Sequence, residues 1–152
     1  RSIIQGGKHR QDSVRAGLDH LDSFTKYVAV HDAARPRVFQ QCVNHGAAAL
    51  AEPINDTLKR ADTDFLVSGS VDRHQLYAMQ TPQIFERQLI EEAYRAVYAE
   101  NLFVTDEVSA VERLGRKVVL VLNDEFNFKI TYPRDLPLAE FVVRRRRDPA
   151  AN

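Results

Sequence analysis

The stretch Tyr27-Val28-Ala29-Val30-His31-Asp32-Ala33-Ala34-Arg35-Pro36 decides the fold. Its apolar opening, rich in valine, predicts a strand buried on both faces, as in the sheet of an α/β protein. The chain then changes abruptly to a polar hexapeptide, which suits a loop at the carboxyl end of a strand, where ligands bind in open α/β sheets. Asp32 could hold a metal ion or a hydroxyl there, and Arg35 could clamp a phosphate. The structural alternative, an ion pair in a connecting loop, stays open on these residues alone.

The composition describes an ordinary globular chain of one domain. Its 152 residues are enough to bury a core, and Lys plus Arg equal Asp plus Glu at 21 each. This balance gives no overall field that would favour nucleic acid or a membrane surface, and no apolar run approaches the roughly 20 residues of a membrane span. Cys42 is the single cysteine, which favours a reducing compartment and hence the cytoplasm. The run Arg144 to Arg147 reads as a solvated end.

The first residues indicate an N-terminally incomplete chain. The sequence starts at Arg1 without a methionine, and Ile3-Ile4 leads directly into Gly6-Gly7, which is typical of the end of a strand followed by a turn. Gln11, Asp12 and Ser13 then offer cap residues for a helix. A strand, glycines and a helix start are a common arrangement for anion or nucleotide binding, although turn geometry alone also explains a Gly-Gly pair.

Periodicity along the rest of the chain alternates between helical and strand-like. We expect helices at 11–21, 38–45, 85–97, 105–114 with Thr105 as N-cap and Gly115 as stop, and from about 135 to 143, with Pro137 in its first turn. We expect strands at 27–30, 47–51, 76–79, 118–122 and 126–131, with a break at Gln80-Thr81-Pro82-Gln83. This order predicts an α/β fold with a mainly parallel sheet. The polar segment from about 53 to 75 has little apolar surface, so it predicts an arm that leaves the main body.

Several kinds of active site are not supported by the motifs. The five histidines lack metal-site spacing and Cys42 has no partner, which argues against zinc. The sequence holds neither a Gly-x-Ser-x-Gly elbow nor a P-loop. What remains is a set of groups suited to phosphate, each placed just after a predicted strand: Arg35, Thr57, Arg73, Thr81, Thr105 and Lys129. Each of them singly could instead be a cap, a surface charge or a turn residue.

Seven motifs, in order, resemble one enzyme family, the cytidylyltransferases that make CDP-methylerythritol. The motifs are Gly6-Gly7-x-x-Arg10-x-Asp12-Ser13-Val14, His31 to Pro36, Asp56-Thr57-Leu58-Lys59-Arg60, Asp72-Arg73, Gln80 to Gln83, Thr105-Asp106-Glu107-x-Ser109-Ala110 and Asn127-Phe128-Lys129-Ile130-Thr131. The resemblance implies a Rossmann-like, three-layer nucleotidyltransferase. It implies transfer of a cytidylyl group from CTP to 2-C-methyl-D-erythritol 4-phosphate, with release of pyrophosphate, in non-mevalonate isoprenoid synthesis.

The resemblance also implies roles for individual residues. Gly7, Arg10, Ser13 and Ala33 would face the cytidine, and Asp32 would help to hold Mg²⁺. The methylerythritol phosphate site would be lined by Arg35, Thr57, Thr81, Thr105 and Lys129. Lys129 would also offset charge in the transition state, and Arg73 would reach the site from a second subunit, which implies a homodimer formed through the arm.

The family pattern begins with a strand and a Gly-rich loop that wraps the triphosphate, and this chain shows neither. We therefore expect the 152-residue chain alone to be inactive or weak. Two alternatives stay open: a cytidylyltransferase for another polyol phosphate, such as ribitol phosphate, and a non-catalytic remnant that binds a phosphorylated ligand or a partner through the arm.

Overall fold

The computed structural model describes residues 2–31, 36–124, 127 and 132–147. They fall into two units, one up to Leu122 and one from Asn123 onward, and each is described by itself. Four predicted site residues, Asp32, Ala33, Arg35 and Lys129, lie outside the described residues. The strand predicted at 126–131 also lies outside them, except for Asn127.

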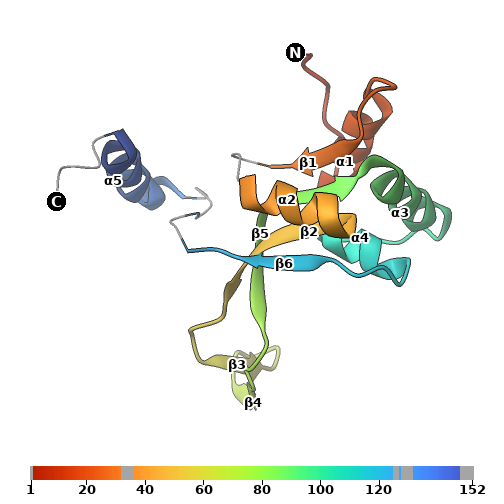
Figure 1. Cartoon of the computed structure of the whole chain (residues 1–152). Coiled ribbons are helices and arrows are strands. Elements are labelled where there is room, and N and C mark those ends of the chain that lie inside the picture. The colour runs from red at the N-terminus through yellow and green to blue at the C-terminus, as the bar shows by residue number, and fades with distance from the viewer. Residues whose placement is uncertain (1, 32–35, 125–126, 128–131, 148–152) are drawn as a thin grey trace. The chain divides into compact units, whose positions relative to one another are not determined.

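The first unit is built on a four-stranded sheet in the order β1-β5-β2-β6 (Figure 1). Its strands are β1 (Tyr27–Val30), β5 (Tyr77–Glu86), β2 (Ala47–Pro53) and β6 (Val119–Leu122). β2 and β6 pair in parallel, whereas β5 pairs antiparallel with both β1 and β2. Three of these strands therefore share one direction and β5 runs against them, so the sheet is mixed and the α/β class is confirmed.

Helices cover both faces of this sheet, which gives three layers. The helices are α1 (Arg10–Asp19), α2 (Pro36–His45), α3 (Arg87–Ala99) and α4 (Glu107–Arg113). Ala47 and Ala49 of β2 belong to the core with α1, α3 and α4, while Ala48 and Leu50 belong to the core with α2. The alternation follows from the pleat, which points successive side chains to opposite faces. Both faces of β2 are thus buried, and this explains its uninterrupted apolar sequence.

The arm predicted at about 53 to 75 is a hairpin of β3 (Leu58–Ala61) and β4 (Val67–Val71), which pair antiparallel. It extends from the end of the sheet where β2 and β5 run on together (Figure 1). The Asp62 carboxylate accepts backbone N–H groups of Asp64 and Leu66 at 3.0 and 2.9 Å, which closes the turn. Phe65 at the tip is 90% exposed.

The strand expected at 76–79 is the first part of a longer strand, and the expected break at Gln80 to Gln83 is wrong. β5 runs without interruption from Tyr77 to Glu86. The β2–β5 ladder shifts register where Ala49 pairs with Gln83 and Ala51 with Met79. Pro82, which has no N–H, therefore lies at an irregularity of the ladder, where a strand tolerates proline. Phe85 lies in this strand, and the following helix begins at Arg87 instead of Phe85.

The structure places the starts of three helices at other residues than the sequence predicts. α1 begins at Arg10 with His9 as N-cap, and Asp12 lies inside the first turn, where its carboxylate accepts the His9 N–H at 3.0 Å. The N-cap of α4 is Asp106 and not Thr105, because the Asp106 carboxylate accepts the Ser109 N–H at 2.9 Å. α2 also starts earlier than expected, at Pro36, a position that suits proline at the first turn.

Strand β1 is less buried than its sequence predicts. Its residues are half-buried and Ala29 is exposed, because β1 pairs only with β5 among the described residues. The strand end expected at Ile3-Ile4 is also not observed, since residues 2–7 are in neither a helix nor a strand.

The second unit contains a short 3₁₀ turn (Pro133–Asp135) that leads into α5 (Leu136–Arg147). Pro137 is the second residue of α5, which confirms that it lies in the first turn.

Gly115, with a φ of +66°, follows the C-cap of α4 and confirms the predicted stop of that helix. Across the described ranges, no helix combines the length and apolarity that a membrane crossing needs.

Candidate functional site

The starts of α1 and α4, far apart in sequence, are joined by an ion pair. The Arg10 guanidinium donates from Nη1 and Nη2 to the two carboxylate oxygens of Glu107, the second bond measuring 2.6 Å. The rings of His9 and Phe103 meet edge to face at a centroid distance of 5.6 Å. The Gln11 side chain accepts the Val104 N–H at 3.1 Å. The segment before α1 and the loop before α4 therefore form one surface.

At the start of α1, Gly7 and Ser13 contact each other directly. The Gly7 N–H donates to the Ser13 hydroxyl at 3.0 Å. A Cβ built on Gly7 would lie 2.2 Å from the Asp12 Cβ, so this close approach requires glycine. The predicted nucleotide residues Gly7, Arg10 and Ser13 are thus gathered by the first turn of one helix.

Asp12 fixes this turn against α3. Its carboxylate accepts the Tyr98 hydroxyl at 2.8 Å and the His9 N–H at 3.0 Å, and these two bonds lower the pKa of Asp12. Burial, followed by the hydrogen bond to Asp12, raises the pKa of Tyr98 to about 12. The bond contributes to both shifts, because it favours a charged carboxylate and a neutral phenol.

On β5, Gln83 ties the sheet to the start of α4. Its buried side-chain oxygen accepts the N–H groups of Glu107 and Val108, both at 3.1 Å, and its amide nitrogen donates to Asp106 at 3.0 Å. Exposed Thr105 directly precedes Asp106, and half-buried Thr81 lies two residues before Gln83. Gln83 therefore brings the segments of Thr81 and Thr105 together. β1 ends nearby, with its last residue opposite Gln83.

Thr57 and Arg73 belong to the arm, not to the network around Gln83. Both are exposed, and Arg73 donates to the backbone oxygen of Asn55 within the arm. The ribbon of the arm leads away from the four-stranded sheet (Figure 1). This placement leaves both side chains on a surface that another chain can reach.

Three largely buried side chains that take part in these contacts were not among the sequence-predicted site residues: Gln83, Tyr94 and Glu107. Glu107 is fully buried and accepts the Tyr94 hydroxyl at 3.1 Å as well as Arg10. The bond to Glu107 raises the pKa of Arg10 above its ordinary value, and burial raises that of Tyr94. Glu107 follows an acidic cap in a helix start, so its sequence context indicates an exposed residue and gives no signal of a buried pair.

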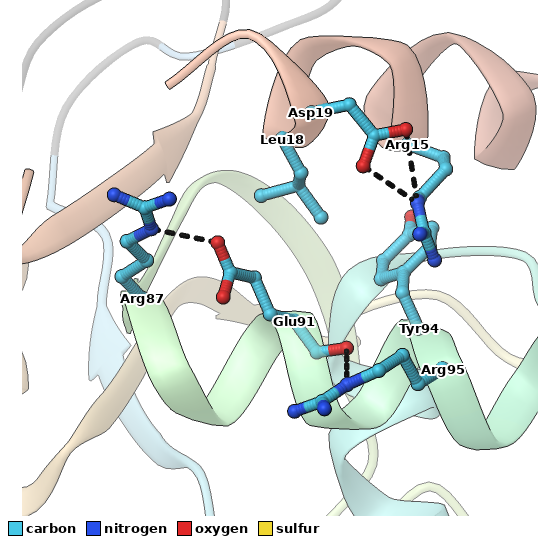
Figure 2. Close-up of a pocket in the computed structure, with 7 residues that line it drawn as sticks. All are labelled: Arg15, Leu18, Asp19, Arg87, Glu91, Tyr94 and Arg95. Atoms are coloured by element: carbon cyan, nitrogen blue, oxygen red, sulfur yellow. Dashed lines mark hydrogen bonds and ion pairs between the residues drawn. The ribbon is translucent and has the colours of Figure 1, made fainter. Parts of the chain in front are cut away.

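A cavity of about 340 Å³ lies between α1 and α3, away from the predicted residues (Figure 2). Its polar lining is already paired: Arg15 with Asp19 at 3.0 Å and Arg87 with Glu91 at 2.6 Å. The Arg95 Nε donates to the backbone oxygen of Glu91 at 3.4 Å. These contacts stabilise the two helices and supply no group that the predicted chemistry needs.

Metal ligands do not gather in the part of the chain that the structure describes, where no group of three or more His, Cys, Asp or Glu side chains could hold an ion. The roles of Asp32, Ala33, Arg35 and Lys129 stay predictions, since these residues lie outside the described ranges.

Comparison with known proteins gives a consistent result. Residues 1–145 match the family model described as 2-C-methyl-D-erythritol 4-phosphate cytidylyltransferase. A protein of that name from Caldanaerobacter subterraneus subsp. tengcongensis is 42% identical over 151 residues, covering 94% of this chain and 66% of the relative. The chloroplastic protein of that name from Oryza sativa subsp. japonica is 39% identical, with 92% of this chain and 50% of the relative covered.

Among solved structures, the protein of the same name from Thermus thermophilus superimposes with a TM-score of 0.81 at 35% identity, covering 92% of this chain and 72% of that one. The chain thus spans just under two thirds of the length of the Caldanaerobacter relative, and half the length of the rice protein.

Proposed function

Because the chain belongs to the 2-C-methyl-D-erythritol 4-phosphate cytidylyltransferase family, we propose that it transfers a cytidylyl group from CTP to 2-C-methyl-D-erythritol 4-phosphate. The products are CDP-methylerythritol and pyrophosphate, in non-mevalonate isoprenoid synthesis. One observation carries this proposal: the Arg10–Glu107 pair and Gln83 join the segment proposed to face the nucleotide to the segments proposed to face the phosphate. A transfer between two substrates needs both half-sites side by side.

The reaction needs positioning and charge neutralisation more than covalent chemistry. A phosphate oxygen of the acceptor attacks the α-phosphorus of CTP in line, a P–O bond forms, and the bond to the leaving pyrophosphate breaks. Hydroxyl donors for the acceptor phosphate come from the three threonines, and positive charge comes from Arg35 and Lys129. Lys129 also offsets the charge of the transition state. The threonines are Thr57, Thr81 and Thr105, and the cytidine is held by Gly7, Arg10, Ser13 and Ala33.

Asp32 is the residue proposed to hold Mg²⁺. A single carboxylate fits this ion, because Mg²⁺ is usually held by one or two carboxylates together with substrate phosphates. When bound, the ion supplies charge neutralisation at the triphosphate oxygens.

The test of this function is a substrate competition. The full-length gene product is incubated with CTP, Mg²⁺ and equal amounts of methylerythritol phosphate and ribitol phosphate, and the two CDP-polyols are quantified by mass spectrometry. We expect CDP-methylerythritol to dominate. A dominant ribitol product would favour the related enzyme class, and a calorimetric titration that shows no binding of CTP would favour a non-catalytic remnant.

The arm is proposed to form a homodimer that completes each site. Its tip exposes Phe65, Leu66 and Val67 at 90%, 65% and 68%, an apolar surface that a second copy would cover. Arg73 is exposed on the same arm and is proposed to reach the acceptor phosphate of the partner.

Mixing two inactive variants tests this shared site. Arg73→Ala and Thr105→Ala are each expected to lose activity. After mixing, half of randomly formed dimers hold one intact site of two, so activity returns to about a quarter of the wild-type value. No recovery on mixing, or a monomer by analytical ultracentrifugation, would contradict the shared site.

The protein is proposed to be cytoplasmic. Cys42, which is buried and forms no disulfide, is consistent with this location.

A further inference from the structure

Glu107 is a carboxylate at a position where carboxylates are rare. Its side chain is fully buried, although Glu is almost never buried unless it is paired. Both of its oxygens are occupied by the Arg10 guanidinium, and Oε1 also accepts the Tyr94 hydroxyl at 3.1 Å. A buried ion pair is often no more stabilising than apolar residues of the same volume. Stability alone therefore does not explain the Arg10–Glu107 pair, whereas the orientation that Glu107 gives to the Arg10 guanidinium can.

The partner, Arg10, is held on one side and open on the other. The Arg10 side chain is 44% exposed, whereas that of Glu107 is 0% exposed. Two of the guanidinium nitrogens donate to Glu107, and arginine carries five N–H donors in a fixed planar fork. The remaining donors thus have a defined direction at the solvent-exposed start of α1, the part of the chain that also holds the Gly7–Ser13 hydrogen bond. The bond to Glu107 also raises the pKa of Arg10, so its charge is secure.

Glu107 is itself anchored from two further sides. Its backbone N–H donates to buried Gln83 at 3.1 Å, which fixes it to the central sheet. Tyr94, fully buried on α3, fixes the carboxylate end. A guanidinium at an exposed helix start would otherwise sample many rotamers, since an arginine side chain has several rotatable bonds and a large conformational entropy.

We propose that Glu107 is a positioning residue for the nucleotide, acting by holding the Arg10 guanidinium in the orientation that contacts CTP. This inference rests on the proposed function. Holding Arg10 in advance removes the ordering cost that the nucleotide would otherwise meet on binding. Glu107 touches no substrate, so its effect passes through Arg10 alone.

A double-mutant cycle on the full-length gene product tests this inference. The variants are Glu107→Gln, Arg10→Ala and the double variant, with the Kd for CTP measured by calorimetry in the presence of Mg²⁺. Glu107→Gln keeps the side-chain size and an acceptor for Tyr94 but removes the charge. We expect it to weaken CTP binding about tenfold, the equivalent of one charge-assisted hydrogen bond. The double variant should bind CTP no more weakly than Arg10→Ala alone.

Steady-state kinetics add a readout that a general loss of structure would not give. The KM for CTP should rise in Glu107→Gln while the KM for methylerythritol phosphate stays constant. Tyr94→Phe should raise the KM for CTP by a smaller factor, and it carries the test if Glu107→Gln does not fold. Asp19→Asn is the matched control, because it breaks the exposed Arg15–Asp19 pair on the same helix and should leave CTP binding unchanged.

Two results would overturn the inference while leaving the proposed function intact. One is wild-type CTP affinity in Glu107→Gln together with weak binding in Arg10→Ala. The other is a double variant whose loss equals the sum of the single losses, since independent residues act additively. Absence of CTP binding by the wild-type protein would overturn the proposed function, and the inference with it.

Discussion

Replacing Gln83 with alanine should destabilise the protein more than its polar character suggests. Gln83 is 3% exposed, and its side chain makes three hydrogen bonds, two accepted from the N–H groups of Glu107 and Val108 and one donated to Asp106. Gln83→Ala leaves two backbone N–H groups at the start of α4 without their acceptor. Each such group costs about 1–3 kcal/mol when buried.

The expected loss is about 3 kcal/mol, because water can enter part of the vacated space and satisfy one of the two N–H groups. That is a large share of the roughly 5–15 kcal/mol that stabilises a typical domain. Urea unfolding followed by far-ultraviolet circular dichroism measures it, since the chain has no tryptophan for fluorescence. Gln88→Ala, at an exposed position of α3, is the matched control and should change the free energy of unfolding by less than about 0.5 kcal/mol.

A second substitution separates the lost hydrogen bonds from lost volume. Gln83→Glu keeps the size and the acceptor oxygen but places a carboxylate against Asp106. It should be destabilised at neutral pH and recover as the pH falls, because protonation removes the repulsion and restores a donor. A free energy of unfolding for Gln83→Ala within about 1 kcal/mol of the wild-type value, at an unchanged m-value, would contradict this role of Gln83.

Other contacts give further expected outcomes. Gly7→Ala should lower the melting temperature, because the new Cβ would lie 2.2 Å from the Cβ of Asp12. Gly17→Ala, whose Cβ would meet no neighbouring atom within 4 Å, should instead stabilise α1 by about 0.5–1 kcal/mol. Calorimetry compares the two variants, and equal effects would contradict the close approach at Gly7. Tyr98 should titrate near pH 12 when followed by ultraviolet absorbance. Because its pKa is raised from 10.0 in the folded protein, the contribution of Tyr98 to stability is complete below pH 10 and is lost as the pH rises through 12. An alkaline unfolding curve that is unchanged in Tyr98→Phe would argue against this. Cys42, buried and with a pKa raised to about 11, should react with a disulfide reagent far more slowly in the native protein than in urea; equal rates would show that the thiol is accessible.

The fold class is predictable from local sequence patterns, because a buried face of a strand requires apolar residues at regular positions. The run from Ala47 to Ala51 predicts a strand buried on both sides, and the structure confirms it. The same reasoning failed at β5, because Pro82 and two glutamines read as a break. Pairing with two neighbouring strands and a register shift, which are tertiary features, make that strand continuous.

The site residues stay predictions, and the contacts among those that the structure describes were only partly predictable from the sequence. The family resemblance placed Gly7 and Ser13 in one site, and the structure shows them in contact because a turn leads directly into the helix start. The pairing of Arg10 with Glu107 joins residues 97 positions apart, and no local pattern encodes such a contact. Glu107 and Gln83 were therefore missed as parts of the site, although both lie within the quoted motifs.

The proposed function is tested most directly by whether the full-length gene product makes CDP-methylerythritol. Phosphorus NMR of a mixture with CTP, Mg²⁺ and methylerythritol phosphate follows both products at once. We expect CDP-methylerythritol and pyrophosphate to appear in equal amounts as CTP disappears. Unchanged CTP, or pyrophosphate released without a CDP-polyol, would contradict it.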